Sequence, residues 1–178
     1  SAATDDDDVV FAGTIPDAAS AALLVELAAS GRLVLAPAPA PSMALALQWL
    51  DSLLPEGRRA GLRELLSATF RGGLALALCR GRAGERVAAA ETLHPGSLAS
   101  GMIVEGRLAA LPEKLGASSG YVTLNTSLAG LVGAGLVEPR EALLRSLDRG
   151  ALLARFREEG VALPPELLRG SPGIAQEA

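Results

Sequence analysis

Four consecutive aspartates near the start of the chain are the densest group of possible metal ligands in the sequence. Asp5 to Asp8 stand directly before a short apolar run. Carboxylate oxygens are ligands that suit Mg²⁺ and Ca²⁺, so these residues could coordinate a divalent ion. They lack the spaced ligand pattern of an EF-hand loop, however, and we therefore expect a solvated acidic segment and no metal site.

One glutamate and the only histidine stand three residues apart. Glu91 lies near the end of an apolar, strand-like run, and His94 begins the turn that follows. A histidine could act as a general base, but no serine or cysteine lies in a recognisable nucleophile elbow, so we expect a turn residue. Glu91 has two interpretations, a polar site at a strand end or a structural carboxylate. We favour the second, in an ion pair with Arg80 or Arg86.

The sequence lacks a complete set of groups for phosphoryl transfer from ATP. That reaction needs a glycine-rich phosphate loop, a lysine against the phosphates, ligands for Mg²⁺ and a residue that positions water. The pattern G-x-x-x-x-G-K-[ST] is absent, and the only lysine, Lys114, has no glycine loop before it. Residues 72–73 (GG) and 118–120 (SSG) are weak candidates for a phosphate loop, and ordinary turn chemistry explains them more simply.

Composition and charge exclude several classes of protein. A chain of 178 residues with 49% hydrophobic and 20% charged residues predicts a globular protein with one good core, or one domain with a helical appendage. The net charge of −4 and the scattered arginines argue against nucleic acid as a partner. We expect no direct membrane insertion, because no apolar run approaches ~18–20 residues, and no secretory signal in the acidic start. The single cysteine, Cys79, fits a reducing compartment.

Apolar runs and turn residues predict an α/β fold. Residues 9–13 form a continuous apolar run typical of a buried parallel strand, and residues 32–35 predict the strand parallel to it. Asp17 is placed to cap the Ala/Leu-rich helix between them. Residues 74–80 and 86–93 flank a glycine-containing turn and predict a β-hairpin. Helices are expected over residues 43–54, 58–70, 98–104, 108–115, 123–134, 139–147 and 152–159.

These elements divide the chain into three parts. Residues 5–93 contain the parallel strands and the hairpin, and residues 94–160 form a helical subdomain. Residues 161–178, rich in proline and glycine, predict a tail with little core to join.

An alternation of alanine and proline follows the second predicted strand. Residues 36–41 read APAPAP, which has no side-chain donor, acceptor or titratable group, although turns after strands often carry chemistry. An exposed run of this kind could be a polyproline ligand for an SH3-like partner. The strand and the helix on either side indicate a tight crossover instead.

Several segments, in order and spacing, resemble one family of ATPases. Residues 6–17, DDDVVFAGTIPD, resemble the DPDxxxxGExRD segment of the type IV pilus and type II secretion ATPases, most of all the pilus-retraction branch. Residues 30–43, SGRLVLAPAPAPSM, resemble the family motif TGHLVxxTLHTxSA. Residues 86–93 resemble the strand grvAaxEi, and residues 123–137 a late family helix. The resemblance covers residues 6–148. It implies a RecA-like, P-loop-type sheet portion with parallel strands and a hairpin, followed by a small helical subdomain.

Departures from the family pattern fall on the positions that carry its chemistry. The catalytic glutamate of the family falls on Thr14, and the arginine after it falls on Pro16. The first histidine falls on Arg32, the histidine of the TLHT element on Pro39, and a glutamine of a later strand on Leu76. We therefore expect no catalytic residue, no assigned nucleotide-binding residue and no cofactor, since ATP and Mg²⁺ are implied by the family alone. In the family, the phosphate loop lies before the region that this chain resembles.

These losses favour a non-catalytic, degenerate pilus or secretion ATPase-like domain that acts through protein–protein association. Removing a positioned base lowers a rate by about 10²–10⁴. One alternative is the C-terminal fragment of an active hexameric, ATP-hydrolysing motor whose P-loop lies outside these residues. Another is a domain that binds a small ligand and has no connection with motility.

The resemblance also implies partners and a location. Family members assemble as rings through faces of this domain, so we expect a homo-oligomer or association with a paralogous ATPase, and contacts with proteins of the pilus or secretion machinery. The same resemblance, through its twitching-motility members, implies a cytoplasmic protein that is peripheral to the inner membrane through its partners.

Overall fold

The computed structural model describes residues 8–115 and 120–168. Contacts group the chain into two compact units, one formed by Ser1–Ala75 with Glu91–Thr123 and the other by Leu76–Ala90 with Leu124–Ala178. The units differ from the sequence-based division at residue 93, because both strands of the hairpin contribute to both units. The α/β class expected from the sequence is confirmed.

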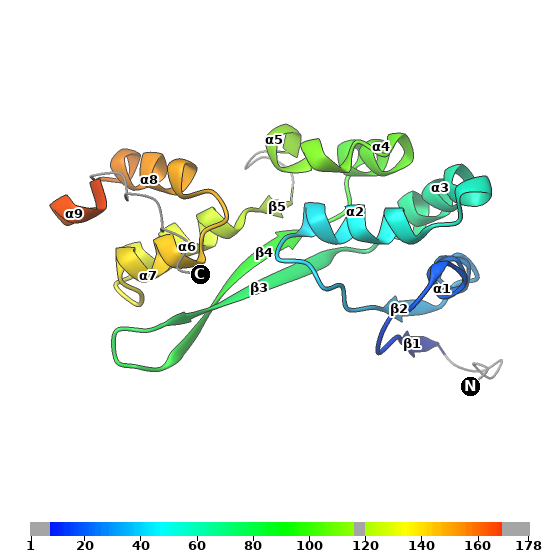
Figure 1. The fold of residues 1–178 in the computed structure, drawn as a ribbon, viewed down its shortest axis with the longest axis horizontal. Helices are drawn as coiled ribbons and strands as arrows, with labels where there is room; N and C mark the ends of the chain where they lie inside the picture. Colours follow the sequence, from blue (N-terminus) through cyan, green and yellow to red (C-terminus); the bar gives the residue numbers. More distant parts are fainter. Residues whose placement is uncertain (1–7, 116–119, 169–178) are drawn as a thin grey trace, which may run out of the picture. The chain divides into compact units, whose positions relative to one another are not determined.

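A strand–helix–strand motif begins the first unit, as predicted (Figure 1). Strands β1 (Val9–Phe11) and β2 (Leu33–Leu35) pair in parallel, and helix α1 (Ala18–Ala29) connects them. Asp17 caps this helix, because its carboxylate accepts a hydrogen bond of 2.8 Å from a backbone N–H of the first turn. Gly31 follows the helix with φ +100°, a conformation that favours glycine, and the chain turns there into β2.

The two parallel strands are less buried than their apolar sequence predicts. Val9, Phe11, Leu33 and Leu35 share one face of the sheet, and their side chains are 55%, 72%, 45% and 49% exposed. The alternate residues are partly buried, and α1 contacts β2. The expectation of a buried strand at residues 9–13 is therefore wrong for the face of the sheet that carries Val9 and Phe11, which is exposed in the described part of the chain. We call these four exposed side chains the apolar sheet face.

Helices fill the rest of the first unit (Figure 1). They are α2 (Met43–Leu53), the 3₁₀ turn Glu56–Arg58, α3 (Arg59–Thr69), α4 (Ser97–Glu105), the 3₁₀ turn Leu108–Ala110 and α5 (Leu111–Leu115). Helix α3 packs against α1 and α4, and α1 also contacts α2. One buried cluster involves α1 and α3: Ile15, Ala21, Ala22, Val25, Leu54 and Leu62. A second joins α2, α4 and α5: Met43, Ala44, Leu47, Leu93, Ala99, Met102, Ile103, Leu108, Leu111, Leu115 and Tyr121.

An ion pair between helices reinforces this packing. The guanidinium of Arg63 on α3 donates two hydrogen bonds to the Asp51 carboxylate on α2, of 2.6 and 2.7 Å. Both side chains are partly buried, and bidentate geometry of this kind is the strongest form of the arginine–carboxylate contact. The pair therefore fixes the register of α2 against α3.

Strands β3 (Gly73–Arg80) and β4 (Arg86–Leu93) form the predicted hairpin. A third strand, β5 (Tyr121–Val122), pairs antiparallel with the end of β4 and places Tyr121 opposite Leu93. Strand β5 was not predicted, because two residues are too few to show an alternating pattern.

The second unit combines part of the hairpin with helices from the C-terminal third of the chain (Figure 1). These helices are α6 (Leu124–Gly133), α7 (Pro139–Arg145), α8 (Arg149–Glu158) and α9 (Pro165–Leu168). Their common core is Cys79, Ala89, Leu124, Leu128, Ala129, Val132, Val137, Ala142, Leu143, Leu152 and Phe156.

Part of the expected tail belongs to this core. Val161, Leu163 and Leu167 pack against it with partly buried side chains. The expectation of little core to join therefore does not hold for residues 161–168, whereas residues 169–178 lie outside the described part of the chain.

Truncation of Leu152 tests the core of the second unit. This side chain is fully buried, so Leu152→Ala removes apolar contacts and leaves a cavity, and we expect a loss of about 2–5 kcal/mol in the free energy of unfolding. Urea denaturation followed by circular dichroism measures the loss. The matched control is Leu147→Ala, at a side chain that is 57% exposed, with an expected change within about 0.5 kcal/mol. Equal effects of the two substitutions would contradict the described core.

Candidate functional site

Two loops meet at one edge of the β1–β2 sheet. Residues 12–17 follow β1 and residues 36–42 follow β2, and parallel strands end at the same edge. A hydrogen bond of 2.8 Å from the Ala12 N–H to the Leu35 carbonyl oxygen continues the pairing into this edge. Thr14, Pro16 and Pro39, three of the positions singled out in the sequence, are exposed on these loops.

The other two positions lie elsewhere. Arg32 precedes β2 and therefore lies at the opposite end of the strand, where its Nη1 donates a hydrogen bond of 2.8 Å to the Ser30 hydroxyl. Its Nε is buried and has no hydrogen-bond partner among the described residues. Leu76 belongs to β3, in the second unit, and is 61% exposed. The structure thus brings together three of the five positions.

The edge formed by the two loops carries little acid–base chemistry. Thr14 supplies a hydroxyl, and Asp17 supplies the one carboxylate within the two loops. The backbone N–H of Ser20 and then its side chain hold the pKa of Asp17 below its ordinary value. Asp17 is therefore an ionised helix cap and a weak base, so this edge offers no group suited to activate a water molecule at neutral pH.

The alanine–proline run is exposed at all three prolines, Pro37, Pro39 and Pro41. The Ala40 N–H donates a hydrogen bond of 2.9 Å to the Ala38 carbonyl oxygen, which makes a tight turn within the run. A polyproline II helix has no internal hydrogen bonds, so the turn interrupts that conformation. The geometry favours the crossover interpretation over a continuous polyproline ligand.

Glu91 is the one carboxylate buried among the described residues of the first unit, with 3% of its surface exposed. Its Oε1 accepts hydrogen bonds from the Met43 N–H (2.7 Å) and from the Tyr121 hydroxyl (3.1 Å). The expected ion pair with Arg80 or Arg86 is wrong: no ion pair of Glu91 is found within residues 8–115 and 120–168. The carboxylate lies instead at the N-terminus of α2, where backbone N–H groups lack partners and favour negative charge.

Burial is the main cause of a raised pKa at Tyr121, and the charge and hydrogen bond of Glu91 add to it. The phenol therefore stays protonated and keeps donating to Glu91 well into the alkaline range. Glu91, α2 and β5 thus form a structural polar centre.

The remaining candidates from the sequence have structural explanations. His94 is exposed, and its backbone N–H donates a hydrogen bond of 2.9 Å to the Gly120 carbonyl oxygen, as expected of a turn residue. Gly72 has φ +148°, a conformation that favours glycine, so the turn explains glycine there. Burial raises the pKa of the Cys79 thiol, so it is a poor nucleophile.

Two candidates involve residues outside the described ranges, namely Asp5–Asp7 of the acidic run and residues 118–119 of the SSG segment. Within residues 8–115 and 120–168, no group of three metal-binding side chains lies close together. In the same part of the chain, no helix combines the length and the apolar character needed to cross a bilayer.

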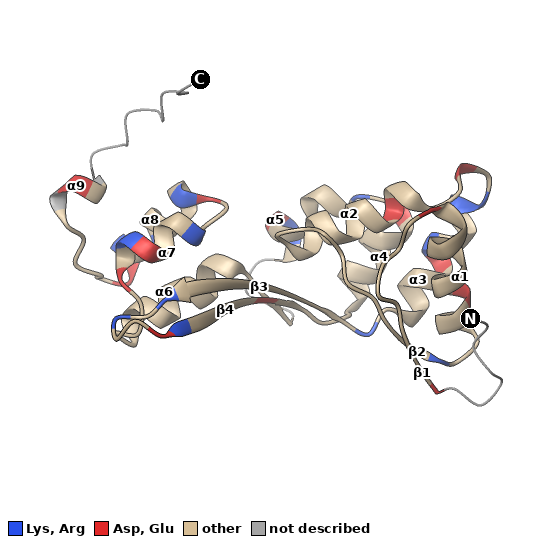
Figure 2. Ribbon diagram, turned by 60° about the horizontal axis from the view of Figure 1, so that its bottom comes forward, with Lys and Arg blue, Asp and Glu red and all other residues tan. Residues whose placement is uncertain are grey.

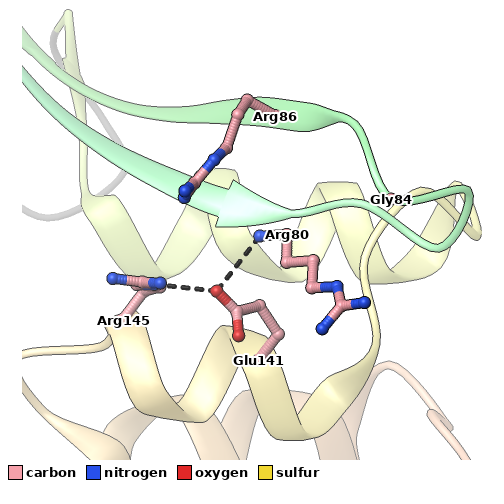
Figure 3. A pocket seen from close by; sticks show the side chains of 5 residues that line it. All are labelled: Arg80, Gly84, Arg86, Glu141 and Arg145. Atoms are coloured by element: carbon pink, nitrogen blue, oxygen red, sulfur yellow. Dashed lines mark hydrogen bonds and ion pairs between the residues drawn. The ribbon is translucent and has the colours of Figure 1, made fainter.

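A cluster of arginines in the second unit was not predicted from the sequence (Figure 2). Arg80, Arg86 and Arg145, with Gly84, line a pocket of about 420 Å³ around Glu141 (Figure 3). Glu141 accepts hydrogen bonds from the Arg145 Nε (2.8 Å) and from the Arg80 backbone N–H (3.1 Å). These two bonds, the first above all, lower the pKa of Glu141, which is ionised at neutral pH.

The arginines are scattered in the sequence but gather in space. Arg80 and Glu141 are 61 positions apart, and only the packing of α7 beside the hairpin brings them together. The one local signal is the presence of arginines on both sides of the hairpin turn, and it does not identify α7 as their neighbour.

Comparison with known proteins relates most of the chain to ATPases of type IV pili. No protein-family model matches it. Over 144 residues it is 28% identical to the type IV pilus retraction ATPase PilT of Pseudomonas aeruginosa. The match covers 80% of this chain and 42% of that protein. It is also 28% identical over 149 residues to a twitching motility protein of Neisseria gonorrhoeae, a match that covers 82% of this chain and 40% of that protein.

The fold agrees with this relationship. A crystal structure of the pilus retraction motor PilT with bound ADP superposes with a TM-score of 0.75 at 24% identity, over 84% of this chain and 43% of that one. The described α/β elements are therefore those of a portion of the PilT fold, as the sequence resemblance implied. The chain spans about two fifths of the length of these relatives.

Replacement of Glu91 tests the structural polar centre. Glu91→Ala leaves the Met43 N–H and the Tyr121 hydroxyl without a partner in a buried place, and each such group costs about 1–3 kcal/mol in unfolding free energy. Urea denaturation is the measurement, and Glu64→Ala, at an exposed position of α3, is the control, with little expected change. If Glu91→Ala proved as mild as its control, the centre would not stabilise the unit.

The pH titration of Tyr121 gives an independent test. The chain has one tyrosine, so the ultraviolet absorbance of phenolate reports this residue alone. Folding raises the pKa of Tyr121, so the protonated phenol stabilises the native state. This contribution to the free energy of unfolding is fully present below the ordinary pKa of about 10, and it is lost as the pH rises through the raised pKa of the native state. We expect a midpoint above 10 in the native chain and a lower one in Glu91→Gln, which removes the negative charge. An unchanged midpoint would contradict the contact with Glu91.

Proposed function

Because most of the chain is related to the ATPases of type IV pili, we propose that it is a non-catalytic, degenerate ATPase-like domain. It acts through protein–protein association in a type IV pilus or type II secretion system. The observation that carries this proposal is the edge formed by residues 12–17 and 36–42, where Thr14 and Pro39 stand in place of a base and a polar side chain. The whole machine, its partners and a cytoplasmic location at the inner membrane are part of the proposal.

Energetics support the non-catalytic half of the proposal. Loss of a positioned base lowers a rate by about 10²–10⁴, and a threonine hydroxyl is not basic enough to replace a carboxylate. Asp17 cannot supply the missing group without giving up its hydrogen bond to the first turn of α1, which stabilises that helix by about 1 kcal/mol.

The apolar sheet face supports the association half. Its four side chains are 45–72% exposed, and an apolar patch of this kind on a two-stranded sheet is typical of a surface that another layer of protein covers. A second copy of the chain or a paralogous ATPase would supply that layer in an oligomer.

The same face also favours one alternative. In the C-terminal fragment of an active hexameric motor, the covering layer would be the part of the relatives that has no counterpart in these residues, together with its P-loop. The chain spans 42% of PilT, which leaves room for such a layer.

Nucleotide binding separates the two functions. Isothermal titration calorimetry measures the binding of ATP and ADP, in Mg²⁺, to this chain and to the longest product of the gene. We expect no tight binding to either if the degenerate domain has also lost its nucleotide pocket. Steady-state ATP hydrolysis by the long product is the second measurement, with Thr14→Glu as the variant that restores a carboxylate. Turnover by the unmodified long product would overturn the proposal in favour of the motor. Turnover only in Thr14→Glu would support a degenerate site with a surviving pocket.

Self-association through the apolar sheet face is the second test. Phe11 is its most exposed member, and we expect Phe11→Ser to weaken self-association about tenfold or more, since burial of a phenylalanine is worth about 1.5–3 kcal/mol. Sedimentation velocity over a range of concentrations measures this change. The control is Leu98→Ser, at an exposed side chain of α4. Equal weakening by both substitutions, or a strictly monomeric native chain with no affinity for a paralogue, would contradict the proposed interface.

A further inference from the structure

Two hollows in the second unit adjoin each other and share Arg80 and Glu141. The first is the pocket around Glu141, and the second, of about 430 Å³, lies between the hairpin turn and α7. Five arginines line the pair, and we call them the arginine groove: Arg80, Arg82, Arg86, Arg140 and Arg145.

The charge of the groove is opposite to that of the chain. Five arginines and two glutamates, Glu138 and Glu141, line the hollows, and the Glu85 carboxylate lies against Gly81 of the second hollow. Positive charge is therefore in excess here, in a protein with a net charge of −4. Figure 2 shows Lys or Arg positions, in blue, on the hairpin and on the helices of the second unit. A concentration of one sign of charge in a hollow attracts ligands of the other sign.

Two of the five arginines form ion pairs within the unit. The Arg82 Nε pairs with Glu138 at 2.9 Å, and the Arg145 Nε with Glu141 at 2.8 Å. The side chains of Arg80, Arg86 and Arg140 form no close ion pair among the described residues, although the charge of Arg86 contributes to the lowered pKa of Glu141. Figure 3 shows the side chains of Arg80 and Arg86 beside Glu141, whose two drawn hydrogen bonds come from Arg145 and from the Arg80 backbone.

The groove has an apolar member as well. Leu144 on α7 lines the second hollow and is 59% exposed. A single phosphate would use one or two arginines and would not contact a leucine. An extended ligand with several carboxylates and an apolar side chain would engage both hollows, because guanidinium groups bind carboxylates through paired hydrogen bonds.

Nucleic acid fits the groove less well. Single-stranded nucleic acids bind where aromatic side chains stack on bases, and no aromatic residue lines either hollow. The negative net charge of the chain also opposes a polyphosphate backbone.

We propose that the arginine groove is a docking site for an acidic peptide segment of a partner protein, in which carboxylates bind Arg80, Arg86 and Arg140 and an apolar side chain contacts Leu144. The site lies wholly within the second unit and needs no nucleotide. It is therefore independent of whether the chain hydrolyses ATP.

Fluorescence polarisation on the full 178-residue chain without nucleotide tests this proposal. The probe is a labelled peptide of about ten residues that alternates Glu, Asp and Leu, a length sufficient to span both hollows in extended form. A peptide with Gln and Asn in place of the acids is the matched control. We expect binding of the acidic peptide alone, weakening steeply from about 50 to about 200 mM salt.

Variants assign the binding to the groove. Arg80→Gln and Arg86→Gln should each weaken the acidic peptide about tenfold or more, because each removes charge-assisted hydrogen bonds. Arg157→Gln, at an exposed arginine of α8 outside both hollows, is the control and should have little effect. Leu144→Ala should weaken the peptide but leave binding of inorganic phosphate unchanged.

One variant is expected to improve binding, which a misfolded protein could not do. Glu138→Gln frees Arg82 and removes a competing carboxylate, so the acidic peptide should bind several-fold more tightly. The proposal is overturned if the Gln/Asn peptide binds equally, if Arg80→Gln and Arg86→Gln match Arg157→Gln, or if Glu138→Gln weakens binding. Tighter binding of inorganic phosphate or of single-stranded RNA than of the peptide would also overturn it.

Discussion

The buried carboxylate of Glu91 is the contact on which the first unit depends. It joins the end of β4, the first turn of α2 and strand β5, three segments that are far apart in the sequence. A buried carboxylate is costly unless hydrogen bonds compensate for its lost water. The Met43 N–H at the N-terminus of α2 and the Tyr121 hydroxyl supply those bonds here. The alanine–proline crossover must therefore deliver Met43 to this carboxylate, which makes its tight turn a geometric requirement of the fold.

The polar side chains of the molecule serve two different ends. At the edge where β1 and β2 finish, threonine, alanine and proline occupy the loops, and the one carboxylate is committed to capping α1. Beside α7, arginines exceed their partners and line open hollows. Chemistry on a nucleotide requires the first region to be reactive, whereas recognition of another protein requires only the second and the apolar sheet face. This contrast is why we favour association over catalysis.

Helix caps and turns could be predicted from the sequence, because they depend on residues that are close together along the chain. The Asp17 cap and the hairpin follow from residues within a few positions of one another, and both are confirmed. The parallel pairing of β1 and β2, whose strands are joined by a single helix, is confirmed as well. The partner of Glu91 could not be predicted, because Met43 is 48 positions away and offers a backbone N–H, which no side-chain pattern reveals.

The exposure of Phe11 was missed for another reason. An apolar strand indicates a surface that should be covered, but it does not say whether the same residues provide the cover. The arginine groove combines both difficulties, since its members are distant in sequence and each resembles an ordinary surface arginine on its own.

Neither unit is one continuous stretch of chain, and this affects the order in which the protein can fold as a ribosome makes it. The first unit needs β5, so it cannot close its sheet until Tyr121 has emerged. Residues 76–90 are synthesised well before the helices that cover them. Cys79 and Ala89 therefore lack their packing partners until α6 to α8 have been made. The hairpin is thus made before the helices that cover it, and it carries alternating leucines at positions 74, 76 and 78 that are still exposed in the finished fold. A long apolar strand left open in this way is where a holding chaperone would be needed most during synthesis.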